Sequence, residues 1–192
     1  MNPDWPPFEV APPKAKLPPT RPMKTVEGRG DRMRVAAFAE LQAIHCFRWA
    51  ADNFKDEVPS SLVSAWNGLA LAEEKHLHWL LDRMKELGIE VEERPVSQDL
   101  YLSLTSCKSA RAFAEFMANA EERGRIAGER FRDALQNIDP ISAKIFGDIA
   151  KEEVEHIELA RRFFDFVPNA AIASKRLRAP EAKNSPTPAP QA

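Results

Sequence analysis

The 192-residue sequence has few of the features that mark secreted, membrane or nucleic-acid-binding proteins. Its only cysteines, Cys46 and Cys107, form no C-x-x-C motif, so we expect two free thiols. No apolar run approaches the ~20 residues that span a bilayer, and the first residues lack the basic start and apolar stretch of a signal peptide. The net charge of -2 gives no basic field for nucleic acid or an anionic membrane. We therefore expect a cytoplasmic protein without a nucleic-acid or membrane partner.

Proline is abundant but concentrated at the two ends of the chain. Half of the sixteen prolines lie in residues 1–30. Because proline lacks an amide donor and disfavours helix in the preceding residue, this segment is predicted to be an extended arm. Trp5 and Phe8 are able to anchor the arm to the domain. Residues 168–192 end in a run of proline, alanine and polar residues that cannot bury a core, which predicts a flexible tail.

The remaining residues, 31–167, are enough for one domain and indicate four long helices without a strand. Gly88 suits the left-handed position that follows a helix, and Asp139-Pro140 offers a capping side chain before proline in the first helical position. Thr105 or Ser106 is the predicted cap of the third helix. The predicted helices are residues 31–54, 59–87, 107–137 and 139–166.

The connections between these helices differ in length. A few residues join the first helix to the second and the third to the fourth, so each pair is predicted to be an antiparallel hairpin. Residues 88–106 are long enough to travel the length of a bundle, which lets the third helix run parallel to the second. The predicted fold is therefore all-α, a ferritin-like four-helix bundle of two hairpins joined by a long crossover.

Two of the four histidines follow a glutamate by three residues. Residues i and i+3 share one face of a helix, so Glu73 with His76, and Glu153 with His156, can each present a carboxylate and an imidazole to one point. The other two histidines fall on different faces and are predicted to be surface or core residues. They are His45 and His78.

Each of these pairs has a partner glutamate on the apolar face of the preceding helix. Glu40 lies 33 residues before Glu73, among alanine and isoleucine, and Glu121 lies 32 residues before Glu153, near Met117. The same arrangement therefore occurs once in each hairpin. Two such halves that face each other would supply four carboxylates and two imidazoles, which is the ligand set of di-iron and di-manganese carboxylate bundles.

The chemistry of these side chains favours a pair of divalent metal ions. Oxygen and imidazole nitrogen suit iron and manganese, and four carboxylates balance two divalent cations. Without a metal, four carboxylates buried together would repel one another and lose their solvation. We prefer iron, although manganese or a mixed pair satisfies the same ligands. The predicted ligands are Glu40, Glu73, His76, Glu121, Glu153 and His156.

Helical phase separates these residues from their acidic neighbours. Glu122 lies about 100° round the helix from Glu121, with charged residues on its side, and is predicted to be solvated. Glu152 is predicted on a solvated face for the same reason. Glu74 is the least clear case, since it adjoins Glu73, but the leucines one turn away favour Glu73 as the inward residue.

Residues 25–29 (Thr-Val-Glu-Gly-Arg) and 37–44 (Ala-Phe-Ala-Glu-Leu-Gln-Ala-Ile) resemble the opening of the DUF455 family of ferritin-like proteins. Residues 73–76, 121–124 and 152–156 resemble its later ligand-bearing helices in order. The resemblance covers roughly residues 20–167 and is more distant to tRNA-modifying di-iron hydroxylases and other ferritin-like oxidases. It implies a di-iron bundle with the six ligands named above, and it implies no particular substrate.

Three functions fit this sequence. The first is an oxygen-activating oxidase or hydroxylase that takes a small-molecule substrate and needs an external electron donor, because nothing resembles a flavin or nicotinamide site. The second is non-enzymatic iron or peroxide handling in the ferritin manner, and the third is a metal-stabilised interaction module. A homodimer is among the expected assemblies. A pocket of several hundred Å³ that reaches the metals would favour the enzyme, whereas a closed apolar core would favour storage.

Overall fold

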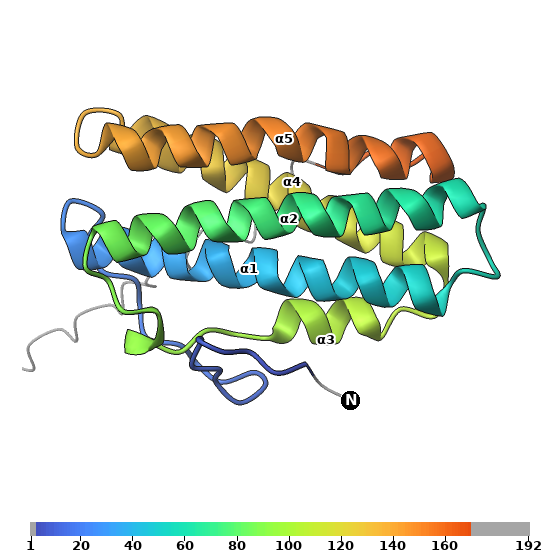
Figure 1. Cartoon of the computed structure of the whole chain (residues 1–192), viewed down its shortest axis with the longest axis horizontal. Helices are drawn as coiled ribbons and strands as arrows, with labels where there is room; N and C mark the ends of the chain where they lie inside the picture. Colours follow the sequence, from blue (N-terminus) through green and yellow to red (C-terminus); the bar gives the residue numbers. More distant parts are fainter. Residues whose placement is uncertain (1–2, 170–192) are drawn as a thin grey trace, which may run out of the picture.

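The structure, a computed structural model, describes residues 3–169, and its regular elements are helices (Figure 1). Its elements are α1 (Val26–Asn53), α2 (Ser60–Glu86), a 3-10 helix η1 (Val91–Glu93), α3 (Asp99–Thr105), α4 (Ala110–Leu135) and α5 (Pro140–Phe164). Within residues 3–169 the only β-type pairing is an isolated parallel bridge between Val10 and Val96. The predicted all-α class is therefore confirmed.

The four long helices lie side by side as two hairpins (Figure 1). α1 packs against α2, and α4 packs against α5. The chain from α2 to α4 runs back along the molecule through η1 and α3, so that α4 runs parallel to α2. The hairpins meet through contacts of α2 with α5 and of α1 with α4. Each of the four helices thus contributes one face to a shared interior.

Two of the predicted helix boundaries depend on single residues and are confirmed. Gly88 has a φ of 66° and lies just beyond the end of α2, in the left-handed region that glycine adopts without strain. Asp139 caps α5 because its carboxylate accepts a hydrogen bond from the backbone nitrogen of Ser142 at 3.1 Å, and Pro140 begins the helix.

The start of the first helix and the end of the last differ from the prediction. α1 begins at Val26 instead of residue 31, because Thr25 is the cap and its hydroxyl accepts a hydrogen bond from Gly28 N at 3.0 Å. The last residues of the predicted arm are therefore helical. α5 ends at Phe164 instead of residue 166. The helix ends there because the next residue, Asp165, takes a left-handed conformation with a φ of 52°.

The crossover contains a helix that the sequence analysis missed. α3 is only seven residues long, too short for a helical pattern of apolar residues to stand out. It is held against α1 by the buried side chains of Tyr101 and Leu104. Thr105 and Ser106 therefore end α3, and the cap of α4 is Ser109, whose hydroxyl accepts a hydrogen bond from Ala112 N at 3.2 Å.

The proline-rich arm lies against the helices. Trp5 and Phe8 are buried, and their rings contact Phe38 on α1 at centroid distances of 5.2 and 5.0 Å. The arm also passes so close to α1 that a Cβ at Gly28 would lie 1.9 Å from the carbonyl oxygen of Pro22. Only glycine fits at this crossing. The predicted tail lies outside the described residues from position 170 onward.

A charge cluster joins the arm, α1 and the crossover. The buried carboxylate of Asp31 accepts hydrogen bonds from Arg21 at 2.7 Å and from Arg94 at 2.6 Å. Arg34, buried beside it, donates to Glu93 at 3.0 Å and to backbone carbonyls of the crossover. Because each charge has several partners, the cluster fixes the crossover on the outside of the α1–α2 hairpin.

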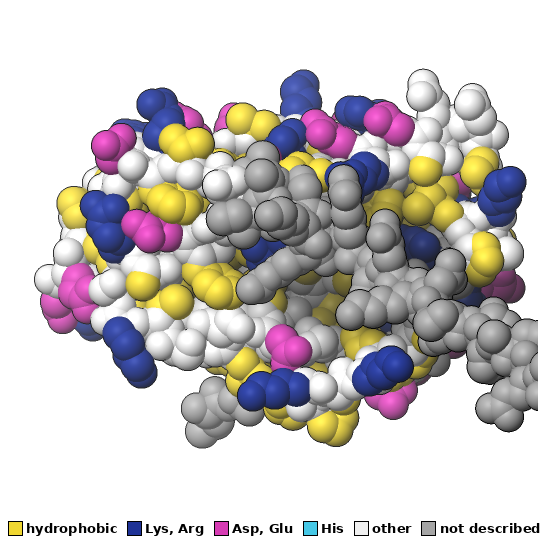
Figure 2. Space-filling view, turned by 180° about the vertical axis from the view of Figure 1, so that it is seen from behind, with side chains coloured by type: hydrophobic (Ala, Val, Ile, Leu, Met, Phe, Trp, Pro, Cys, Tyr) yellow, Lys and Arg dark blue, Asp and Glu magenta, His cyan; other side chains and the backbone are white. Residues whose placement is uncertain are grey.

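The rear face of the molecule carries no large patch of a single charge sign outside the part covered by grey atoms (Figure 2). Figure 2 shows acidic and basic side chains interspersed over the rear face, outside the part covered by grey atoms. Across the described range, none of the helices combines the length and the apolar character that crossing a membrane requires.

Replacing Asp31 by asparagine should destabilise the fold in a pH-dependent way. Burial raises the pKa of Asp31, but hydrogen bonds and charge from Arg21 and Arg94 outweigh it and hold the pKa below its usual value. A lowered folded-state pKa contributes stability above the ordinary aspartate pKa of about 3.9, and this stability is lost as the pH falls through the folded-state value.

Urea unfolding at pH 7 should therefore show Asp31→Asn to be less stable by about 2 kcal/mol, and the difference should shrink below pH ~4. Asp52→Asn, at an exposed position of the same helix, is the control. Equal effects of the two substitutions at pH 7 would contradict a stabilising role for the charge cluster.

Candidate metal centre

The structure brings all six predicted site residues together inside the four-helix arrangement. They lie near the middle of their helices, Glu40 on α1, Glu121 on α4 and one glutamate–histidine pair on each of α2 and α5. All six are buried, with exposed fractions between 0 and 8%. The site is therefore an interior cluster of ionisable groups to which every long helix contributes.

Helical phase accounts for which acids point inward. Glu73 is fully buried, whereas Glu74, the next residue, lies nearer the surface and pairs with Arg48 on α1. Successive residues are about 100° apart on a helix, so Glu73 and Glu74 point in different directions and only Glu73 reaches the cluster. The open choice between Glu73 and Glu74 is decided in favour of Glu73 as the inward residue.

The cluster divides into two overlapping groups, each with ligand atoms that lie within 4.8 Å of one another. The first group is Glu40, Glu73, His76 and Glu153, and the second is Glu73, Glu121, Glu153 and His156. Metal–oxygen and metal–nitrogen bonds of about 2.0–2.2 Å place two ligands of one ion at most about 4.4 Å apart. A contraction of a few tenths of an ångström would therefore bring either group onto an ion.

Glu73 and Glu153 belong to both groups and lie between the two imidazoles. The Nδ1 atom of His156 lies 2.8 Å from Glu73 Oε1 and 3.1 Å from Glu153 Oε2. The Nδ1 atom of His76 lies 3.3 Å from Glu73 Oε2 and 3.5 Å from Glu153 Oε1. The two rings are stacked with centroids 5.8 Å apart. Each imidazole thus directs the same nitrogen at the same two carboxylates.

The hydrogen bonding of these atoms is incomplete. Four buried side-chain atoms of residues 3–169 have no hydrogen-bond partner there, and three belong to this cluster: Glu73 Oε1, Glu153 Oε2 and His156 Nδ1. They approach one another closely but not at hydrogen-bonding angles. Buried polar atoms without partners are costly. If all three atoms were bound to metal ions, none would be left without a partner. The residues present therefore fit a metal.

The electrostatics also call for positive charge in the cluster. Burial and the charges of Glu73 and Glu153 raise the pKa of Glu40 and of Glu121 well above the usual range. Burial lowers the pKa of His156, but the neighbouring carboxylates of Glu153 and Glu73 outweigh it and raise the pKa to about 11. Protons therefore neutralise the carboxylates when no metal is present, and a metal must displace them.

Glu152 is a residue of the site whose role the sequence analysis missed. It stays partly exposed, as its predicted solvated face implies, but its Oε2 atom also lies 2.9 Å from His76 Nε2 and is bound by Lys75. With Nδ1 of His76 facing the cluster, Nε2–H can donate to the Glu152 carboxylate and hold the ring in place. Sequence spacing gave no signal for this contact, because it crosses from α5 to α2.

The remaining candidates stand outside the cluster. His45 packs its ring edge against Trp5 at 5.3 Å, and His78 is exposed. Glu122 is more buried than predicted, because Arg125 covers it with a hydrogen bond of 2.7 Å. Neither these histidines nor Glu122 belongs to the two ligand groups.

These features define an all-helical protein with a buried cluster of carboxylates and imidazoles that can hold metal ions. The chain belongs to the DUF455 family, described as a protein of unknown function, whose model matches residues 2–178. Searches of curated proteins and of solved structures give no match. The site residues therefore have to be interpreted from their own geometry.

Removing the carboxylate behind His76 should weaken metal binding. Glu152→Ala leaves all six inward residues intact but deprives the His76 ring of its outer hydrogen bond. Loss of such a partner typically lowers metal affinity about 10–100-fold. Competition with a metal-sensitive dye, on purified wild type and variant, measures the change.

Glu155→Ala is the matched control, since Glu155 is exposed on the same helix. Equal metal affinity of the two variants would show that Glu152 does not position His76.

Proposed function

We propose that this protein is a ferritin-like dimetal carboxylate protein that binds two metal ions and reacts with dioxygen. The observation that carries the proposal is the pair of overlapping ligand groups. Glu73 and Glu153, common to both groups, would bridge the metals. Glu40 with His76 would complete one metal position, and Glu121 with His156 would complete the other. Two hairpins joined by a crossover match the ferritin-like connectivity.

Iron is the metal that this ligand set favours for oxygen chemistry. Carboxylate oxygen and imidazole nitrogen accept ferrous and ferric iron, and a carboxylate can change its binding mode between the two states. Four carboxylates neutralise two divalent ions, which removes the repulsion that raises the pKa of Glu40 and Glu121. Manganese or a mixed pair fits the same ligands.

The protein's part in the reaction is to hold the ligands and exclude water. When bound, two ferrous ions supply one electron each, and these with two protons reduce one dioxygen to hydrogen peroxide. The imidazole of His76 is held by its contacts with Glu152 and Glu73, and the imidazole of His156 lies within 3.1 Å of the Glu73 and Glu153 carboxylates. Because the cluster is buried, each charge acts in a medium of low dielectric and is stabilised by fixed partners rather than by water.

Two uses of such a centre remain candidates. An oxidase or hydroxylase would pass the oxidising power to a small organic molecule and would need an external electron donor. The alternative, iron handling in the ferritin manner, is favoured by one observation. The cavity beside His156 has a volume of about 10 Å³, which is far too small for an organic substrate. Two larger hollows of about 430 and 420 Å³ lie elsewhere, and none of the six residues lines them.

Metal analysis of purified protein tests the dimetal proposal. After anaerobic loading with ferrous iron and removal of the excess, mass spectrometry should find two iron ions per chain. Glu121→Ala should lower this occupancy, because it removes a buried ligand, while Glu122→Ala should not, since Glu122 pairs with Arg125. Fewer than one iron per wild-type chain would sink the dimetal proposal, and the reverse order of the two variants would refute the helix phase.

Exposure of the loaded protein to dioxygen tests the reaction. Absorbance should record the change from ferrous to ferric iron, and an oxygen electrode should record one dioxygen consumed per two irons if hydrogen peroxide is the product. Two bound irons that stay ferrous in air would exclude the oxygen chemistry and leave only a metal-binding function.

A further inference from the structure

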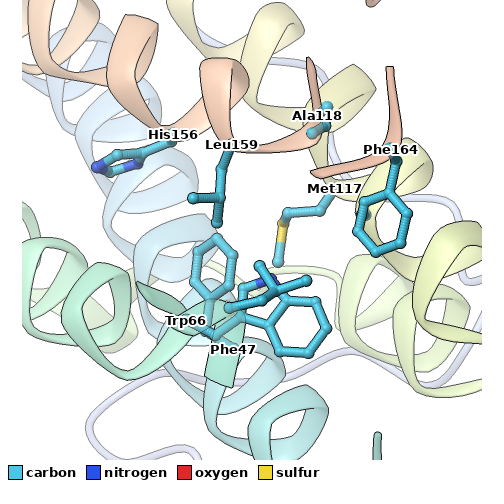
Figure 3. Close-up of a pocket in the computed structure, with 10 residues that line it drawn as sticks. Phe47, Trp66, Met117, Ala118, His156, Leu159 and Phe164 are labelled. Atoms are coloured by element: carbon cyan, nitrogen blue, oxygen red, sulfur yellow. The ribbon is translucent and has the colours of Figure 1, made fainter. Parts of the chain in front are cut away.

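A small cavity lies between the four long helices, next to the candidate metal centre. It has a volume of about 10 Å³ and is lined by side chains from α1, α2, α4 and α5 (Figure 3). A buried space needs about 10–15 Å³ to hold a molecule of the size of water. The cavity is therefore near the size of one such molecule, and it adjoins His156, one of the six residues of the centre.

The cavity exists because three alanines meet where α4 packs on α5. Ala114, Ala118 and Ala160 form a separate small cluster of buried residues there. Around them stand large side chains that are almost fully buried, among them Phe47 and Trp66. Protein interiors are close-packed, so a space bounded by rigid aromatic rings and short alanines does not collapse easily.

Most of the side chains that line the cavity are apolar, although polar atoms contribute about as much of its accessible surface as apolar atoms do. Nine of the ten side chains belong to alanine, leucine, methionine, phenylalanine or tryptophan, and His156 is the exception. The Nδ1 atom of His156 points to Glu73, so it is engaged with the metal cluster. A buried water usually makes about three hydrogen bonds, whereas apolar cavities stay dry and accept apolar molecules such as xenon. The cavity thus offers apolar contacts to a small apolar molecule on the sides away from His156.

The cavity also provides a route. His156, Ala160 and Phe164 follow one another at successive turns of α5 and all line the cavity. Figure 3 shows His156 and Phe164 on either side of it. Ala160 is buried, while Leu159 and Phe164 are only partly buried, so the lining reaches from the metal cluster toward the outer end of the helix. A molecule that enters near Phe164 would meet His156 at the inner end.

We propose that this cavity is the site through which dioxygen reaches the metal pair. The inference rests on the proposed function, because it assigns to the cavity the oxidant of that reaction. Dioxygen is small and apolar, which fits the volume and the apolar side chains that form most of the lining. The position beside His156 delivers it to the Glu121–His156 metal position rather than to the Glu40–His76 position, where Glu152 and Lys75 cover the outer side of the imidazole.

Xenon binding to the metal-free protein tests the cavity without any redox chemistry. In NMR spectra under increasing xenon pressure, resonances of Trp66 and Leu62 should shift and saturate. Ala118→Val and Ala160→Val fill the space from two different helices, and each should abolish the shifts. Leu159→Ala enlarges the space and should bring saturation to lower pressure. Ala143→Val is the control, because Ala143 is a similarly buried alanine of α5 outside this cavity.

Dioxygen uptake by the iron-loaded protein then tests the route. Ala160→Val should lower the second-order rate constant with dioxygen by about tenfold, with the iron content per chain unchanged and Ala143→Val unaffected. Xenon shifts that persist in both filled variants would overturn the assigned site. Xenon binding without any change in the uptake rate of the filled variants would overturn the route.

The two proposals fail in different ways. Two bound irons without xenon shifts in the wild type would overturn the cavity and leave the dimetal function standing. Xenon shifts without iron binding would overturn the dimetal function, and with it the assignment of dioxygen to the cavity.

Discussion

Burying four carboxylates in one interior is possible only if positive charge is buried with them. Glu73 and Glu153 each lie between two imidazoles, and the rings respond with raised pKa values, that of His156 reaching about 11. The pKa values of the acids next to them, Glu40 and Glu121, are raised too, because burial and the charges of Glu73 and Glu153 disfavour a further negative charge. A cluster with this demand for cations is satisfied either by protons or by metals. The ligand geometry, with two groups that share two carboxylates, favours metals.

The rest of the fold keeps these helices at a fixed separation. The two hairpins provide four inward faces, and the crossover returns the chain so that each hairpin contributes a similar set of residues. Around the α1–α2 hairpin, the buried Asp31 and Arg34 bind the arm and the crossover through ion pairs with partly exposed partners. Charge compensation thus operates in two places. In the outer cluster the chain supplies both signs, whereas at the centre it supplies an excess of acids.

The two halves of the centre differ in their surroundings although their ligands repeat. His76 is backed by Glu152 and Lys75, which cover its outer nitrogen with polar groups. His156 instead borders a small cavity that exists because alanines lie opposite one another on α4 and α5. The half that contains His76 therefore holds its imidazole in place, whereas the half that contains His156 leaves space beside its imidazole. Under the proposed function, this asymmetry would separate metal retention from access by a small molecule.

The sequence by itself determined that there are four long helices and how they are connected. It also determined which residues point inward, because the 3.6-residue period dictates which side chains share a face. It also determined local ends such as Gly88 and Asp139, where one residue decides the backbone. Contacts between helices were decided only by the tertiary structure. Glu152 against His76, the short α3 against α1 and the alanine-lined cavity all join residues far apart in the chain, and periodicity within one helix carries no information about them.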